Sequence, residues 1–344
     1  MTTPRDLVHR TLEFKNTGRV PRQLWVLPWA DNHYPEELRK IKDDFPDDIV
    51  LVEGDWFTST EGFQTREGDP EGDPYAAGTY LDVWNCKFSN SDSGYIGEVK
   101  HPLIREENWE DRDLLRTPEA CLRIDVDAIN SFCEKTDRFV LAPDWARPFE
   151  RMQFIRGTEQ LYIDLITRPG GMFEVLEKVH DYYCRMLETW ANTGVDGLWF
   201  MDDWGAQSAL LISPDTWVEL FKPLYRDYID IAHSHGKKIF MHSDGYILDI
   251  IPHLIELGLD AVNSQVFCMG LENLQPFRGK LTFWGEIDRQ HMLPYGRLDD
   301  IDGAVRSLKD TLWADGGCIA QCEFGVGARP ENVYRVYETW NKIV

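Results

Sequence analysis

Eight short apolar runs, spread from residue 22 to residue 323, constrain the fold of this chain more than any other feature. From the third run onward, one amphipathic helical pattern separates each run from the next. This alternation is typical of a parallel sheet with helices outside it, and eight strands predict a (β/α)₈ barrel. The runs cover residues 22–28, 48–55, 138–145, 197–204, 237–244, 259–265, 281–288 and 316–323.

Helix end signals support this interpretation. Ser213 and Pro214 precede the helical segment 215–236, where serine is favoured as the N-cap and proline as the first helical residue. A doubly wound open sheet is the alternative fold, and it normally places a glycine-rich phosphate loop after its first strand. The stretch after residues 22–28, "WADNHYPEE", has no glycine, so the barrel is favoured.

The length of the chain predicts a single domain with an insertion. The 344 residues exceed the roughly 250 that are typical of such a barrel. No linker or low-complexity tract divides the sequence, so we expect one domain over residues 1–344. The excess fits an insertion at residues 58–137, between the second and third strands, which contains the turn-rich stretch 66–80.

Charge and composition exclude several classes of function. The 36 Lys and Arg residues against 59 Asp and Glu give a net charge of -23, which repels nucleic acid and anionic membranes. The first 14 residues predict a capped amphipathic helix rather than a secretion signal, and no run of eighteen apolar residues occurs. The seven cysteines lack C-x-x-C spacing, so we expect free thiols, with Cys184 packed. These features predict a cytoplasmic protein.

Polar side chains at the carboxyl ends of the predicted strands define the expected active site, because barrel enzymes place their sites at this face. The pocket should be rich in acids, with imidazole side chains and one thiol. Its expected members are Asp31, His33, Asp55, Asp144, Arg147, Asp202, Asp203, His242, Asp244, Glu286, Asp288, Cys322 and Glu323.

His242 and Asp244 predict a metal site. They lie two residues apart and therefore on the same side of an extended strand. Together with Cys322 or Glu286 they would supply the three protein ligands of a catalytic zinc with an open fourth position. In the alternative interpretation, Asp244 caps a helix in residues 246–258 and His242 is hydrogen-bonded beneath it.

Asp202 and Asp203 predict acid/base chemistry, since adjacent carboxylates in a dry cleft raise one another's proton affinity. Successive strand residues point opposite ways, so we expect only one of the two in the pocket. In the alternative interpretation, one of the pair faces the barrel wall and binds an arginine.

Four motifs resemble the uroporphyrinogen decarboxylase superfamily, and specifically its branch of corrinoid-dependent methyltransferases and relatives. They are "TYLDVWNCKFSNSDSGYIGEVKHPL", "FERMQFIRGTEQLYIDL", the segment from Gly197 to Gly245, and "WGEIDRQHMLPYG". The resemblance covers nearly the whole chain and implies a (β/α)₈ barrel. By analogy it also suggests a homodimer.

The decarboxylase branch fits poorly. Its members typically follow the first strand with an arginine-bearing stretch, M-R-Q-A-G-R-Y, whereas here Pro28 and Asn32 lie near the arginine positions. A cleft lined by Asp55, Asp202 and Asp244 would also repel a tetrapyrrole that bears many carboxylates. Porphyrinogen decarboxylation is therefore disfavoured.

The methyltransferase branch fits better. The resemblance implies His-x-Cys and a later cysteine as zinc ligands, and here His242, Asp244 and Cys322 stand in their places. Asp for Cys makes the site harder and richer in oxygen. The function implied is methyl transfer between a small-molecule donor and a corrinoid (cobalamin), carried on a partner protein, with Asp202 or Asp203 protonating the departing group.

Other side chains are expected to bind the ligands of this pocket. Flat aromatic rings near strand ends can receive a corrin ring or an aromatic substrate, whereas mid-strand Trp25 and Trp199 should pack inside the barrel. The expected substrate- or cofactor-binding residues are Asp55, Glu286, Trp29, Trp56, Trp145 and Trp204. Two other functions stay open: a decarboxylase or lyase for a smaller substrate, with Asp55 or Asp202 stabilising positive charge, and a silent barrel scaffold that only binds.

Overall fold

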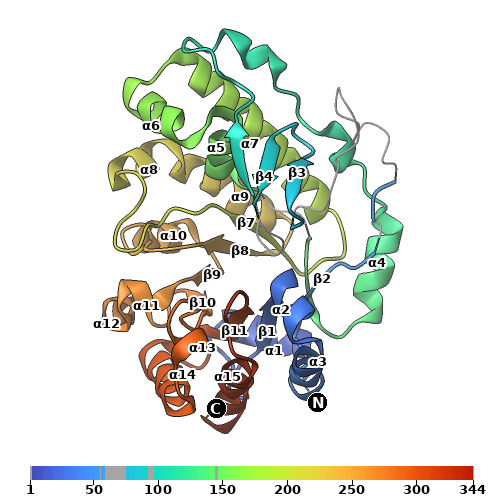
Figure 1. Ribbon diagram of the computed structural model, residues 1–344. Helices are drawn as coiled ribbons and strands as arrows, with labels where there is room; N and C mark the ends of the chain where they lie inside the picture. Colours follow the sequence, from blue (N-terminus) through green and yellow to red (C-terminus); the bar gives the residue numbers. More distant parts are fainter. Residues whose placement is uncertain (1, 55, 59–74, 92–96, 144–145, 344) are drawn as a thin grey trace.

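The computed structural model describes residues 2–54, 56–58, 75–91, 97–143 and 146–343. Eight parallel strands form its main sheet in the order β1-β11-β10-β9-β8-β7-β6-β2, with helices around them (Figure 1). Each strand overlaps one predicted run, so the predicted (β/α)₈ barrel is confirmed. The strands are β1 (Arg22–Val26), β2 (Ile49–Leu51), β6 (Phe139–Leu141), β7 (Gly197–Met201), β8 (Lys238–Ser243), β9 (Ala261–Ser264), β10 (Thr282–Trp284) and β11 (Cys318–Phe324).

The helices lie outside the strands. Before β7 they are α1 (Pro4–Leu12), α2 (Pro28–His33), α3 (Pro35–Asp44), α4 (Val126–Lys135), α5 (Pro148–Arg156), α6 (Thr158–Thr167) and α7 (Gly170–Ala191). After β7 they are α8 (Pro214–Leu220), α9 (Lys222–Ser234), α10 (Ile251–Leu257), α11 (Val266–Met269), α12 (Leu271–Leu274), α13 (Met292–Tyr295), α14 (Leu298–Leu312) and α15 (Pro330–Ile343). No helix in the described part of the chain is long and apolar enough to cross a bilayer.

The predicted end signals act where expected, with one difference. Ser213 caps α8 and accepts a hydrogen bond from the Thr216 N–H at 3.1 Å. The segment 215–236, however, forms two helices, α8 and α9, that meet at Phe221. Pro223 in the first turn of α9 has no N–H to donate to the preceding turn, which explains the break.

A small antiparallel sheet lies between β2 and β6 in the sequence. Its strands are β3 (Gly78–Leu81), β4 (Lys87–Asn90) and β5 (Glu98–His101), and the 3₁₀ helices η1 (Glu110–Leu114) and η2 (Glu119–Leu122) follow them. Arg151 of α5 forms a buried ion pair with Asp82, and its guanidinium lies 4.9 Å from the ring centroid of Trp84. Figure 1 shows the small sheet beside α5 and α7.

Aromatic side chains fill the barrel interior. Trp25 of β1 and Trp199 of β7 both pack against Trp284 of β10, with centroid distances of 5.0 Å and 6.0 Å. Phe240 of β8 lies against the same Trp284 at 5.2 Å. Trp25 and Trp199 therefore pack inside, as the sequence suggested. Trp25 also lies against His242, at 5.3 Å, so this aromatic layer supports the site from below.

Candidate active site

His242 has a defined orientation near the carboxyl end of β8. The ring is buried, and its Nδ1 lies 2.6 Å from the Asn263 Oδ1. The Asn263 side-chain amide donates to the Trp284 carbonyl, so its oxygen is the atom left to accept from His242. Nδ1 therefore carries the proton of the neutral ring, and Nε2 presents a lone pair to the pocket.

Two carboxylates face His242 Nε2. Asp203, which follows β7, places Oδ1 at 3.6 Å, and Asp244, which follows β8, places Oδ1 at 3.7 Å. The Asp244 N–H donates to Asp203 Oδ1 at 2.9 Å, which links the two loops. Burial lowers the pKa of His242, but Asp244 and Asp203 outweigh it and raise the pKa overall. The three ligand atoms lie within 4.8 Å of one another, which suits a divalent cation.

Two predictions about this group were wrong. Cys322 is not near it, because its Sγ is buried 3.6 Å from the Tyr337 hydroxyl of α15. Residues alternate along β11, so Gln321 and Glu323 point inward where Cys322 points outward. Nor does Asp244 cap a helix, since α10 begins only after its N-cap residue Ile250.

Asp202 points away from the pocket, so its predicted catalytic role was wrong. Its carboxylate is fully buried and accepts the N–H groups of Phe149 (3.1 Å) and Glu150 (2.9 Å) at the start of α5. The Tyr225 hydroxyl donates to it at 2.8 Å. Asp202 thus accepts the free N–H groups at the start of α5. The alternative interpretation, in which one of the two aspartates binds an arginine, does not describe Asp202. Asp203, with 38% of its side chain exposed, is the carboxylate at the pocket.

The tryptophans predicted to bind ligand lie in different surroundings. Trp204 is fully buried, stacks on Phe149 at 4.1 Å and donates to the Tyr225 hydroxyl, so its predicted ligand contact was wrong. Trp29 is half-buried and stacks on His33, and half-buried Trp56 packs against Trp190. Asp55 and Trp145 lie outside the described residues.

Arg289 links Asp244 to two further acidic side chains at the pocket, Glu323 and Glu286. It binds Asp244 Oδ2, lies 3.2 Å from Glu323 Oε2 and lies 3.7 Å from Glu286 Oε1. Asp244 and Glu323, together with Asp203 beside His242, outnumber this one guanidinium, which leaves a negative excess that a bound cation would offset. No role was predicted for Arg289, although it directly follows the predicted run 281–288. The sequence signal that could have indicated its role is its position three residues after Glu286.

Comparison with known families decides the affiliation. The profile described as uroporphyrinogen decarboxylase (URO-D) matches residues 81–343. The chain belongs to the uroporphyrinogen decarboxylase family.

A solved structure with a similar fold supports the barrel architecture. A methyltransferase from Methanosarcina mazei is 13% identical, with 99% of each chain covered and a TM-score of 0.66. A 3-keto-D-glucoside 4-epimerase from E. coli is 16% identical over 64% of this chain and 85% of its own, with a TM-score of 0.39. At these identities the first match shows a shared fold, and the second carries no argument. A comparison with curated proteins gives no match.

The pocket of this uroporphyrinogen decarboxylase family member is small. A cavity of about 130 Å³ lies beside the metal-ligand group, and its lining includes Gln265, Cys268, Glu286, Arg289 and His291. Gln265 Nε2 lies 3.3 Å from Asp244 Oδ1, which joins the cavity to that group. A shallower hollow of about 690 Å³, lined by residues of α12 and α14 among others, lies outside the barrel. The small cavity is therefore the hollow that adjoins Asp203, His242 and Asp244.

Glu286 is the most unusual acid in this cavity. It is only 2% exposed, and neither of its carboxylate oxygens has a hydrogen-bond partner among the described residues. Burial, with contributions from Asp244 and Glu323 and against the opposing Arg289, raises the pKa of Glu286 to about 8. Glu286 therefore carries a proton at neutral pH. It lines the pocket, as the sequence predicted, but its contact with a ligand stays a prediction.

Glu286 should make the folded protein less stable as the pH rises. Its pKa of about 8 compares with 4.5 for a free side chain, so between these values the folded state holds a proton that the unfolded state has lost. The stability it contributes is complete below about pH 4.5 and is lost as the pH rises through 8, by at most about 1.4 kcal/mol per pH unit. Urea unfolding at about pH 5.5 and about pH 8.5 should therefore show a smaller loss in Glu286→Gln than in wild type. Equal losses of stability in wild type and Glu286→Gln would contradict this pKa. Glu37→Gln, an exposed position on α3, is the control.

Proposed function

We propose that this protein is a metal-dependent methyltransferase that moves a methyl group from a small-molecule donor to a corrinoid carried by a partner protein. The observation that carries the proposal is the Asp203, His242 and Asp244 group at the carboxyl end of the barrel. His242 stands where the resemblance to the methyltransferase branch places a zinc-binding histidine. Asp244 takes the place of the cysteine two residues later, and Asp203 takes the place of the late cysteine.

The residues present fit a divalent metal. The buried His242 Nε2 is held toward the two carboxylates by Asn263, an outer hydrogen bond of the kind that orients metal-binding histidines. One nitrogen and two oxygens form a harder donor set than His-x-Cys, and they suit zinc, iron or manganese. A metal bound there would act as a Lewis acid on the heteroatom of the methyl donor.

The chain's own residues would then hold the donor and supply a proton. Transfer of the methyl group as CH₃⁺ to a Co(I) corrinoid leaves the electron pair of the broken bond on the donor heteroatom. That atom needs a proton to leave as a neutral product, and protonated Glu286 faces the same cavity. Arg289 holds Asp244 and Glu323 in place around it.

The size of the cavity supports a corrinoid that arrives from outside. About 130 Å³ is well below the roughly 300 Å³ at which pockets for drug-sized ligands begin. A small methyl donor fits such a space, whereas a corrin ring does not. The corrinoid would therefore meet the methyl group at the mouth of the barrel, as a partner protein could present it.

Metal analysis tests the metal site. His242→Ala should lose about one equivalent of divalent metal per chain relative to wild type, because it removes the one nitrogen ligand. Mass spectrometry of protein purified without a His-tag measures this loss. His253→Ala, on α10, is the matched control and should keep the wild-type content. Equal metal in wild type and His242→Ala would remove the site from the proposal.

Activity measurements separate the remaining functions. Co(I) corrinoid should be methylated with one of a panel of methoxy or methylamine donors, and loss of the Co(I) absorbance reports the reaction. Release of CO₂ from small carboxylic acids without corrinoid consumption would favour the decarboxylase alternative. Absence of both reactions, together with no bound metal, would favour a barrel scaffold that only binds.

A further inference from the structure

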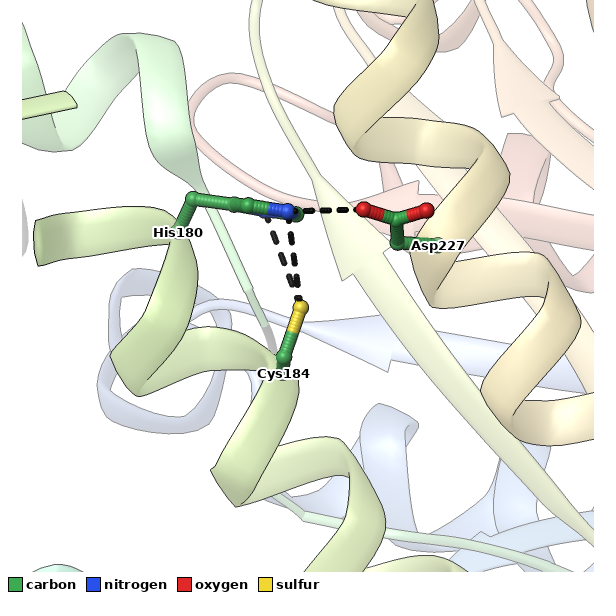
Figure 2. A group of neighbouring side chains, drawn as sticks. All are labelled: His180, Cys184 and Asp227. Atoms are coloured by element: carbon green, nitrogen blue, oxygen red, sulfur yellow. Dashed lines mark hydrogen bonds and ion pairs between the residues drawn. The ribbon is translucent and has the colours of Figure 1, made fainter. Parts of the chain in front are cut away.

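A second group of metal-ligand side chains lies outside the barrel, on two neighbouring helices (Figure 2). His180 and Cys184 are four residues apart on α7 and therefore lie on one face of that helix. Asp227 reaches toward them from α9, and its Oδ2 lies 3.0 Å from His180 Nε2. The sequence predicts a packed thiol at Cys184, because no spacing along the chain indicates that α9 brings a carboxylate beside it.

The separations between these side chains resemble those of a zinc site. The Cys184 Sγ lies 3.6 Å from His180 Nε2, and the three ligand atoms lie within 4.8 Å of one another. Zinc bonds of about 2.0 Å to nitrogen and about 2.3 Å to sulfur place two tetrahedral ligands roughly 3.5 Å apart. Asp227 has 56% of its side chain exposed, so it is free to move outward by the small amount that a bound ion requires.

Tyr228 holds the ring of His180 in position. The His180 Nδ1 lies 3.2 Å from the buried Tyr228 hydroxyl, and either group can be the donor. Nε2 faces Asp227 on the other side of the ring. Hydrogen bonds to the second ring nitrogen, which orient the imidazole, are typical of metal-binding histidines. Asn263 makes a contact of this kind with His242 in the barrel.

A nucleophilic Cys-His-Asp group is the competing interpretation, and the surroundings of the thiol oppose it. Burial, together with the charges of Asp227, Asp181 and Glu188, raises the pKa of Cys184 to about 12. A nucleophile needs the thiolate at neutral pH, so these surroundings oppose a nucleophilic role for Cys184. The same negative charges favour a divalent cation, which would displace the thiol proton on binding.

We propose that His180, Cys184 and Asp227 bind a divalent transition metal of the zinc class, with the fourth position open to water. The ion joins α7 to α9, two outer helices that pack against each other around Tyr228. Because the unfolded chain does not hold these ligands together, the ion stabilises the folded protein in proportion to its free concentration. This site is independent of the proposed methyl transfer.

Cobalt(II) distinguishes this site from the one in the barrel. A cobalt–thiolate pair has a charge-transfer absorption, and the barrel group offers only nitrogen and oxygen ligands. Metal-free full-length protein carrying Cys268→Ala, which removes the other half-buried cysteine, should develop this absorption and saturate at about one thiolate-bound cobalt per chain. Adding Cys184→Ser should abolish it. Adding Asp227→Asn should weaken binding of the thiolate-bound cobalt at least about 10-fold, and adding His242→Ala should leave the thiolate–cobalt absorption unchanged.

Thermal stability gives an independent measurement. In the His242→Ala background, Zn²⁺ should raise the melting temperature, and the rise should disappear when Cys184→Ser or Asp227→Asn is added. Melting without metal shows whether these variants still fold, and exposed Asp227→Asn is the variant least disturbing to the helix. The proposal is overturned if no thiolate–cobalt absorption develops, if it survives Cys184→Ser, or if Zn²⁺ stabilises all variants equally.

Discussion

Asp203→Ala should lower methyl transfer at least about 100-fold and leave the melting temperature nearly unchanged, whereas Asp202→Ala should do the reverse. Asp203 is 38% exposed and accepts one backbone hydrogen bond, from Asp244, so its loss costs about 1 kcal/mol of stability. The same change removes one of the three proposed metal ligands. Activity should therefore fall through the metal and not through unfolding.

Asp202→Ala acts on the fold instead. It leaves three buried donors without an acceptor, the N–H groups of Phe149 and Glu150 and the hydroxyl of Tyr225. Unpaired buried donors cost about 1–3 kcal/mol each, so we expect a loss of roughly 3 kcal/mol or more. Thermal unfolding and corrinoid methylation of both variants measure the contrast. A large activity loss in a fully folded Asp202→Ala, with an active Asp203→Ala, would exchange the two roles.

Asp164→Ala should destabilise the protein by about 3–5 kcal/mol, because it leaves a buried guanidinium without its counter-charge. Arg156 Nε lies 2.7 Å from Asp164 Oδ2, and both side chains are buried. The same guanidinium donates to the Glu106 carbonyl at 2.8 Å and lies 4.4 Å from the centroid of Trp109. This arginine therefore holds the segment before η1 against α5 and α6.

A surface ion pair provides the control for this prediction. Arg168 and Glu219 lie 2.9 Å apart, but Glu219 is mostly exposed, so Glu219→Ala should cost less than about 1 kcal/mol. Adding Arg156→Met to Asp164→Ala should recover part of the loss, since the unpaired charge disappears while the Glu106 carbonyl stays without its donor. Urea unfolding midpoints compare the variants. Equal shifts in Asp164→Ala and Glu219→Ala would show that the buried pair contributes little.

The barrel was predictable because its signals are local. Each strand is an apolar run, and each end signal, such as Ser213 before α8, works through neighbouring residues. The strand ends also located His242, Asp244 and Glu286 at one face, since parallel strands in a barrel share their carboxyl ends.

The direction of single side chains was not predictable in the same way. Parallel strands in a barrel are buried on both faces, so their sequences are apolar throughout and show no alternation. For this reason the sequence could not show that Cys322 points toward α15 or that Asp203, rather than Asp202, faces His242. The burial of Trp204 depends on α5, because its partner Phe149 comes from that helix.

The sequence by itself determined the barrel, its strand ends and the imidazole and acids that gather there, because periodicity and capping act between residues close in the chain. Only the tertiary structure decided which side chains meet. It brought Arg289 among three carboxylates, set the tautomer of His242 through Asn263, and placed Asp227 of α9 beside His180 and Cys184 of α7. Such groupings depend on how separate elements pack, and no spacing along the chain encodes that packing.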